Sequence, residues 1–187
     1  MTCPLCTAAL DRTTLLASGD APELRGFACP DGHGTFLPSD LYFAWREGRE
    51  PSDASGALPA SEAVGDVKQA KLCPQDGRIM RRYRTDAEGF WLDRCSTCGG
   101  VWFDGDEWDA TVEAGLVERL GAIFSDAWQR NVEEALTAQR WDDKLEAEIG
   151  ADDLARIDAF RAWAWEHPQR HLVFARMQER PASGAEE

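Results

Sequence analysis

The side chains best suited to chemistry in this chain are its six cysteines, which fall into two sets. Each set joins one short loop to a second loop further along the sequence, and a residue other than cysteine completes it. The first set is Cys3, Cys6, Cys29 and His33, and the second is Cys73, Asp76, Cys95 and Cys98. A loop with ligands at positions i and i+3 wraps around a metal ion, and two such loops fill a tetrahedral shell. The spacing therefore predicts two closed zinc sites, with one ion in each.

The fourth ligand of the second set is a carboxylate. Zinc accepts carboxylate oxygen as well as thiolate sulfur and imidazole nitrogen, and Gly77 supplies the turn that such a loop needs. We therefore predict that Asp76 is a ligand. Two alternatives stay open: a second site that holds no metal, and a cross-braced arrangement that joins the Cys3 loop to the Cys95 loop.

The two halves of the chain repeat each other. An offset of 66 positions pairs Cys29 with Cys95, Gly34 with Gly100, Phe36 with Trp102, Leu37 with Phe103 and Asp40 with Asp106, and an offset of 70 pairs Cys3 with Cys73 and Pro4 with Pro74. Each copy is expected to hold a knuckle, a hairpin, a second knuckle, an aromatic pair and a short helix. In the second copy, strands are predicted at 78–84 and 90–94, separated by turn-forming residues.

A short helix is predicted after the second knuckle of each copy. In the first copy it starts at residues 39–40, where a capping side chain is present, and ends at Gly48. In the second copy, Asp104 and Glu107 form a capping-box pattern, which predicts a helix that starts at Gly105 and ends near Gly115.

The composition changes twice along the chain. Residues 49–70 are rich in Ala, Ser, Pro, Gly and Asp with almost no large apolar side chain, which is typical of a linker. After residue 115, apolar residues recur at helical spacing within an acidic sequence. We therefore predict a small α+β protein of two zinc ribbons and an α-helical C-terminal region. Its expected parts are a first ribbon with its helix at 1–48, a flexible linker at 49–70, a second ribbon with its helix at 71–115 and an acidic helical region at 116–187.

The second ribbon carries a motif known from a protein family. Residues 95–107 read C-S-T-C-G-G-V-W-F-D-G-D-E. They resemble the second half of the bacterial TFIIB-like transcription factor zinc-finger ribbon, C-x-x-C-G-G-x-W-x-D-x-x-E. The resemblance covers Leu72 to about Leu116 well and residues 1–41 loosely. It implies a zinc-bound ribbon whose ligands here are Cys73, Cys95 and Cys98, and Asp76 stands where the family has its second cysteine.

The charge of the chain disfavours polyanionic partners. Its 34 acidic residues against 20 Lys and Arg give a formal net charge of −14, which repels nucleic acid over most of the surface. One basic cluster opposes that balance. It consists of Lys68, Lys71, Arg78, Arg81, Arg82 and Arg84, with Arg94 nearby. This cluster is either a solvated strand face or a phosphate-binding surface, and its members beside Asp76 are candidates to offset the charge of the second site.

We recognise neither a targeting signal nor a catalytic motif in the sequence. No basic and then apolar leader opens the chain, and its apolar runs are too short to span a bilayer, so we expect a cytoplasmic protein without membrane contact. Four filled ligand positions leave none for a substrate, so we expect no enzymatic activity and no catalytic residue. The favoured function is an adaptor that binds another protein. The alternatives are a transcription regulator that binds nucleic acid weakly and salt-sensitively through the basic hairpin, and a metal-dependent enzyme.

Overall fold

The computed structural model describes residues 1–17, 22–47, 49 and 69–179. The predicted linker, 49–70, therefore lies almost wholly outside the described residues. The chain divides into two compact units, Met1–Ala135 and Leu136–Glu187. Both sequence repeats, with all eight predicted ligands, belong to the first unit.

Each repeat folds into a hairpin, a third strand and a helix. In the first copy these are β1 (Asp11–Leu16), β2 (Leu24–Ala28), β3 (Gly34–Leu37) and α1 (Ser39–Arg46). In the second copy they are β4 (Arg81–Arg84), β5 (Trp91–Arg94), β6 (Val101–Asp104) and α2 (Glu107–Glu113). The predicted small α+β fold with an antiparallel sheet is confirmed, and the strands of the second copy are shorter than predicted.

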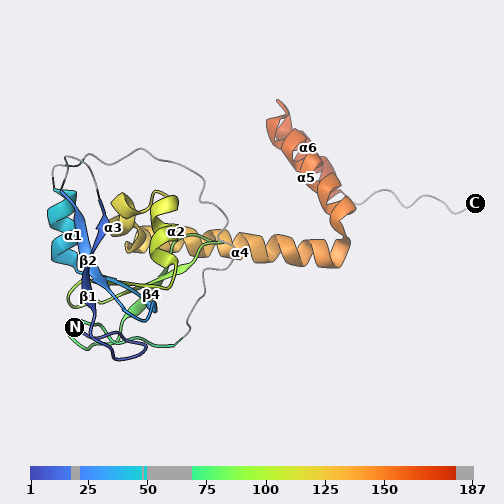
Figure 1. Ribbon diagram of the computed structural model, residues 1–187. Helices are drawn as coiled ribbons and strands as arrows, with labels where there is room; N and C mark the ends of the chain where they lie inside the picture. The colour runs from blue at the N-terminus through green and yellow to red at the C-terminus, as the bar shows by residue number, and fades with distance from the viewer. Residues whose placement is uncertain (18–21, 48, 50–68, 180–187) are drawn as a thin grey trace, which may run out of the picture. The chain divides into compact units, whose positions relative to one another are not determined.

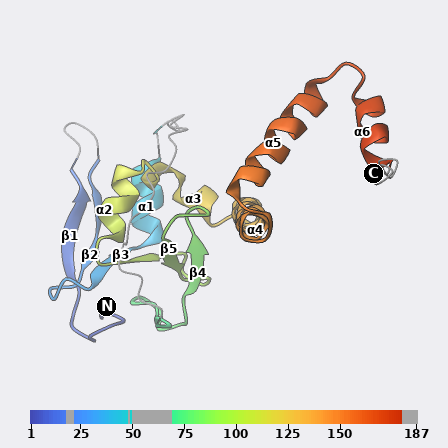
Figure 2. The ribbon, with the colours of Figure 1, turned by 90° about the vertical axis from the view of Figure 1, so that its right-hand side faces the viewer.

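The two copies share a single sheet. Its strand order is β1-β2-β3-β6-β5-β4, because the third strand of each copy pairs with that of the other. Figure 2 shows β1 and β4 toward opposite sides of this unit, with α1 and α2 between them. Equivalent strands of the two copies lie at equal distances from the β3–β6 pair, so the copies are related by an approximate twofold axis.

The register places this axis at an aromatic pair. Phe36 lies opposite Trp102 in the β3–β6 ladder, and these two residues are also equivalents in the sequence repeat. Each aromatic ring covers a glycine of the other copy, Gly34 at the start of β3 or Gly100 just before β6. A Cβ on Gly34 would lie 2.9 Å from the Trp102 ring, and one on Gly100 would lie 2.4 Å from the Phe36 ring. The contact is therefore reciprocal, as in a symmetric dimer interface.

Successive side chains of β3 and β6 point to opposite faces of the sheet, so the unit has two cores. Leu37 and Phe103 belong to the core under the helices, with Trp45 of α1 and Trp108 of α2. Phe36 and Trp102 belong to the other core, together with buried cysteines. The buried members of that second core are Cys3, Cys29, Phe36, Cys73, Met80, Cys95 and Trp102.

Three further helical segments follow in the first unit. These are the 3-10 turn η1 (Val117–Arg119), α3 (Leu120–Ile123) and the start of α4 (Asp126–Ile149). The first turn of α4 covers the outer edge of β4, where the Gln129 amide accepts from Arg84 N at 3.3 Å and donates to Arg84 O at 2.9 Å. Trp128 Nε1 donates to Thr85 O at 3.0 Å. The chain itself thus covers the sheet edge at the end of β4.

The second unit is helical, as predicted. It contains the end of α4, then α5 (Ala151–Glu166) and α6 (Arg170–Gln178), and Trp165 packs edge-on against Phe174 at 5.0 Å between ring centroids. Several of its large apolar side chains are exposed, among them Trp141, Trp163 and Leu172. Figure 1 labels the helices α1 to α6 and colours the chain by residue number. Within the described residues, every helix is too short or too polar to cross a bilayer.

Candidate metal centres

The first knuckles of the two copies have the same backbone. The amide of Cys3 donates to Ala8 O at 2.8 Å, and the amide of Cys73 donates to Arg78 O at 2.7 Å. Each loop then turns through a left-handed residue, Thr7 with φ 65° or Gly77 with φ 71°. Glycine adopts this conformation readily, whereas threonine is strained there. The predicted offset of 70 is therefore a true structural equivalence.

In the first site, all four predicted residues converge. Cys6 Sγ lies 3.6 Å from Cys29 Sγ, and Cys29 Sγ lies 3.4 Å from His33 Nδ1. With Cys3, their ligand atoms all lie within 4.8 Å of one another. The Asp31 carboxylate accepts from Cys6 Sγ at 3.4 Å, a neighbour that the sequence interpretation missed.

In the second site, Asp76 occupies the position of Cys6. Its Oδ2 lies 3.2 Å from Cys95 Sγ, and Cys73 Sγ lies 3.5 Å from Cys98 Sγ. The Arg78 amide donates to Asp76 Oδ1 at 3.0 Å, and this hydrogen bond is the main cause that holds the pKa of Asp76 below its usual value. The carboxylate is therefore ionised and fixed beside three sulfur atoms.

Both donor sets fit zinc. Sulfur atoms that share a tetrahedral zinc ion lie about 3.8 Å apart, because each Zn–S bond is about 2.3 Å long. The sulfur separations given above match that value and far exceed a disulfide bond, and all six cysteines are free. Loop amides also donate to the sulfur atoms: Leu5 N to Cys3, Gln75 N to Cys73, Thr97 N to Cys95 and Gly100 N to Cys98, each at 3.4 Å.

Two thiols of the second site, those of Cys73 and Cys98, favour ionisation only when a metal is bound. Burial raises the pKa of Cys73 and that of Cys98, so without a cation these groups hold their protons. A zinc ion bound here would stabilise the thiolates and release the protons. The expected cofactor, two zinc ions per chain, agrees with the two clusters. The sequential pairing of loops is the one observed, and the structure does not show the cross-braced arrangement.

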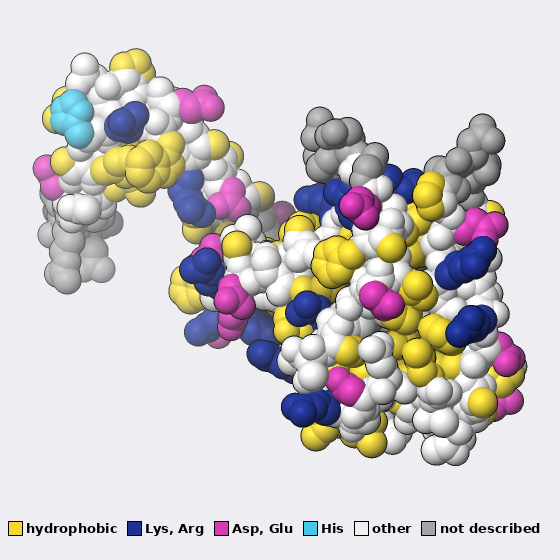
Figure 3. Space-filling model, turned by 90° about the vertical axis from the view of Figure 1, so that its left-hand side faces the viewer, with side chains coloured by type: hydrophobic (Ala, Val, Ile, Leu, Met, Phe, Trp, Pro, Cys, Tyr) yellow, Lys and Arg dark blue, Asp and Glu magenta, His cyan; other side chains and the backbone are white. Residues whose placement is uncertain are grey.

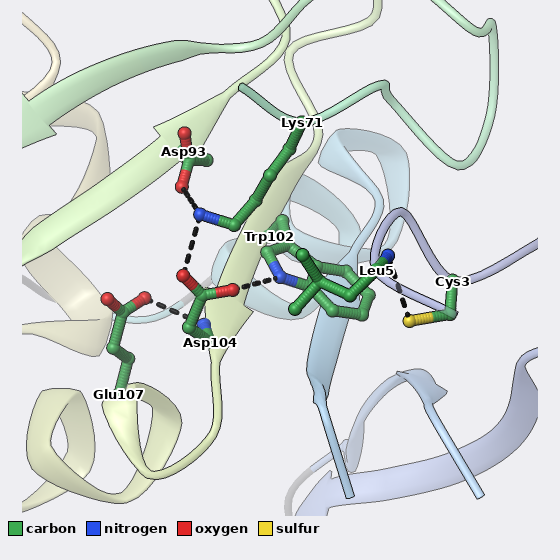
Figure 4. Close-up of polar contacts among 7 residues, drawn as sticks. All are labelled: Cys3, Leu5, Lys71, Asp93, Trp102, Asp104 and Glu107. Carbon is green, nitrogen blue, oxygen red and sulfur yellow. Dashed lines mark hydrogen bonds and ion pairs between the residues drawn. The ribbon is translucent and has the colours of Figure 1, made fainter. Parts of the chain in front are cut away.

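Lys71 corrects the interpretation of the basic cluster. Its side chain is completely buried, and its Nζ lies 2.7 Å from Asp93 Oδ2 and 2.6 Å from Asp104 Oδ2 (Figure 4). Lys71 therefore contributes nothing to a surface patch and cannot offset the charge of the second metal site. This role could not be predicted from the sequence, because a lysine near arginines is usually exposed to solvent.

Asp104 and Glu107 also act differently from a capping box. Asp104 Oδ1 accepts from Trp102 Nε1 at 2.7 Å, while its other oxygen faces Lys71. One half of the capping box forms: Glu107 Oε2 accepts a hydrogen bond from the Asp104 amide at 2.7 Å. The Asp104 carboxylate, which would form the other half, binds Trp102 and Lys71 instead. Helix α2 accordingly begins at Glu107 rather than Gly105. The W-x-D-x-x-E part of the motif thus builds a buried polar network beside the metal centre.

The other basic residues of the second hairpin lie against aromatic rings. The Arg82 and Arg84 guanidinium groups lie 4.7 and 5.3 Å from the centroid of the Trp91 ring, and that of Arg94 lies 5.2 Å from that of Phe124. These contacts hold the side chains flat on the protein surface. Arg78 and Arg81 are exposed, and Lys68 lies outside the described residues.

A comparison with known families finds a similarity in the second copy. Residues 72–114 match the model of the zinc ribbon family described as "Transcription factor zinc-finger". This match confirms the predicted resemblance over the region that contains the second metal site. The first copy is supported by its own cysteine cluster and by the shared backbone of the knuckles. Comparisons with curated proteins and with solved structures found no match.

Proposed function

We propose that this zinc-binding protein is a cytoplasmic, non-enzymatic adaptor that binds another protein. Two zinc ions stabilise the shared sheet, and each donor set already supplies four ligands, which leaves no position for a substrate. Ligand thiols need a reducing compartment, which supports a cytoplasmic location.

The observation that carries the proposal is the state of the basic hairpin. Lys71 is enclosed by two carboxylates, and Arg82 and Arg84 lie on Trp91 instead of extending into solvent. A phosphate-binding surface needs several extended cations, and here they oppose a net charge of −14. Apolar side chains are exposed instead, among them Phe43 and Trp163, and aromatic surface is what protein partners use.

The alternative is a transcription regulator that binds nucleic acid. It is favoured by the family description of residues 72–114 and by the exposed Arg78 and Arg81. The two functions differ in salt dependence, because phosphate contacts release counterions whereas apolar burial is not screened.

One pair of measurements separates them. Zinc-loaded full-length protein is titrated against a fluorescent DNA duplex at several salt concentrations, and partners are captured by cross-linking in native cytoplasm with and without nuclease. The adaptor function predicts weak duplex binding that disappears as salt rises, and a nuclease-resistant partner. Nanomolar duplex binding near physiological salt, lost in the Arg81→Ala/Arg82→Ala variant, would replace the adaptor by the regulator.

A further inference from the structure

The approximate twofold symmetry is broken at one place. In the second copy, the buried Lys71 side chain reaches the carboxylates of Asp93 on β5 and Asp104 on β6. By the two offsets, their counterparts in the first copy are Met1, Phe27 and Pro38. The hairpin registers agree with this equivalence, because Phe27 lies opposite Arg12 as Asp93 lies opposite Arg82.

At that place the first copy is hollow. Met1, Phe27 and Pro38, with Leu41 of α1, line a half-open cavity of about 590 Å³. This volume is within the range of ligand-binding pockets. Figure 3 views the side on which α1, β1 and β2 lie in Figure 1, and it shows hydrophobic side chains gathered there with Lys and Arg beside them. The cavity is therefore the unfilled equivalent of a site that the second copy fills with its own side chain.

The cavity adjoins an open strand edge. Thr14 of β1 lines it and is the counterpart of Arg84, whose backbone is capped by Gln129. Strand β1 is at the end of the sheet, and among the described residues no second strand pairs with its outer side. An unpaired strand edge beside a cavity with both apolar and polar lining residues is an arrangement in which an extended peptide can add a strand and place a side chain in a pocket.

Charge selects the kind of peptide. Two arginines line the cavity: Arg12 lies over the Phe27 ring at 6.0 Å, and Arg25 is exposed with one loose ion pair, 3.4 Å, to Glu23. Asp40 is the one acidic residue among the described residues of the lining, so two arginines lie there beside a single carboxylate, and Glu23, the ion-pair partner of Arg25, lies outside the lining. Guanidinium groups prefer carboxylates as partners.

We propose that the edge of β1 and this cavity bind an extended acidic segment of a partner protein, with one aromatic or large aliphatic side chain in the cavity. The proposal rests on the adaptor function and names the surface and the chemistry through which it acts. The main chain of the segment pairs with β1, its carboxylates face Arg12 and Arg25, and its apolar side chain takes the space that Lys71 occupies in the other copy.

The test uses a displayed library of random peptides, selected on the zinc-loaded full-length protein. The Arg25→Trp variant serves as the counter-target, because the counterpart of Arg25 is Trp91, on which two arginines stack. The substituted position is exposed, so the variant should keep both zinc ions and its amide spectrum elsewhere. Arg81→Ala, an exposed arginine outside the cavity, is the matched control.

Selected sequences should combine Asp or Glu with one aromatic or large aliphatic residue. Arg12→Ala and Arg25→Trp should each weaken their binding by about tenfold or more, because a charge-assisted hydrogen bond is lost in either variant. Arg81→Ala should bind like the native protein, and amide resonances of β1 should shift on binding.

Selection of neutral or basic sequences, or of peptides that bind native and Arg25→Trp protein equally, would overturn the proposal, as would the absence of any enriched sequence. If the Arg25→Trp variant still captured the same cross-linked partner, the peptide site would be wrong but the adaptor function would stand. A protein that captured no partner and bound duplex tightly would instead refute the adaptor function.

Discussion

Replacing the buried Lys71 by methionine, the residue at the equivalent position in the first copy, should strongly destabilise the protein. At an effective dielectric of about 20, a charge pair separated by 2.7 Å attracts by about 6 kcal/mol, and Lys71 makes two such contacts. Most of this attraction offsets the cost of removing three charges from water. Removing the cation alone leaves Asp93 and Asp104 buried without it, which costs about 3–5 kcal/mol. A small domain is stable by only about 5–15 kcal/mol.

The assay is denaturant unfolding of zinc-loaded protein, with zinc content measured before each experiment. Lys144→Met, at an exposed lysine of α4, is the control and should change the free energy of unfolding by less than about 0.5 kcal/mol. Adding Asp93→Leu to Lys71→Met removes one of the two stranded carboxylates and should recover part of the loss. A loss below about 1 kcal/mol in Lys71→Met, or no recovery in the double variant, would refute the account of this network.

Three further outcomes follow from the metal centres and from Glu107. Elemental analysis of protein purified without added metal should find about two zinc ions per chain; one zinc would show that the Asp76 site is empty, and a predominance of iron would contradict the closed zinc sites. Asp76→Ala should weaken zinc affinity of the second site by at least ~10–100-fold, the loss that results when a residue that only contacts a ligand is changed. Asp76→Cys should preserve or strengthen the affinity, and competition with a chelator measures both. Unchanged zinc retention in the alanine variant would mean that Asp76 is not a ligand. Burial raises the pKa of Glu107 to about 9 from its ordinary 4.5, so the folded state holds one more proton than the unfolded state between these pH values. The contribution of Glu107 to stability is complete below about pH 4.5 and is lost as pH rises toward 9, by up to about 1.4 kcal/mol per pH unit. The Glu107→Gln variant should lack this pH dependence in its free energy of unfolding. Equal pH profiles for the native protein and the variant would contradict the raised pKa.

The ligands could be predicted because a zinc knuckle is local. Cys73 and Asp76 are three residues apart, and the turn at Gly77 follows from the residue type alone. Helix α1 is likewise a local feature and begins at Ser39, but the predicted side-chain cap is wrong: Pro38 is the N-cap residue, and the Ser39 hydroxyl donates to Cys98 O instead. The repeat could also be detected, since Phe36 and Trp102 are equivalents at a constant offset.

Non-local contacts escaped prediction. Nothing in the residues around Phe36 indicates that β3 pairs with β6, because edge pairing depends on the shape of both complete copies. The burial of Lys71 depends on Asp93 and Asp104 arriving from two different strands. The local sequence predicts a helix cap at Asp104, but the carboxylate of Asp104 instead binds Lys71 and the Trp102 indole. Tertiary structure overrode the local preference at that position.

The pairing of β3 with β6 has a consequence for synthesis on the ribosome. Strand β3 is made long before β6, so the nascent first half has a bare backbone edge on the side that the finished protein covers. A bare edge is where two unfinished chains can join, and β3 of a second nascent copy is the sequence equivalent of the chain's own β6. The edge is only four residues long, which limits such a contact to a few hydrogen bonds. Production of this protein is therefore expected to be most vulnerable to misassembly on crowded polysomes, and least so when the second half is synthesised without delay.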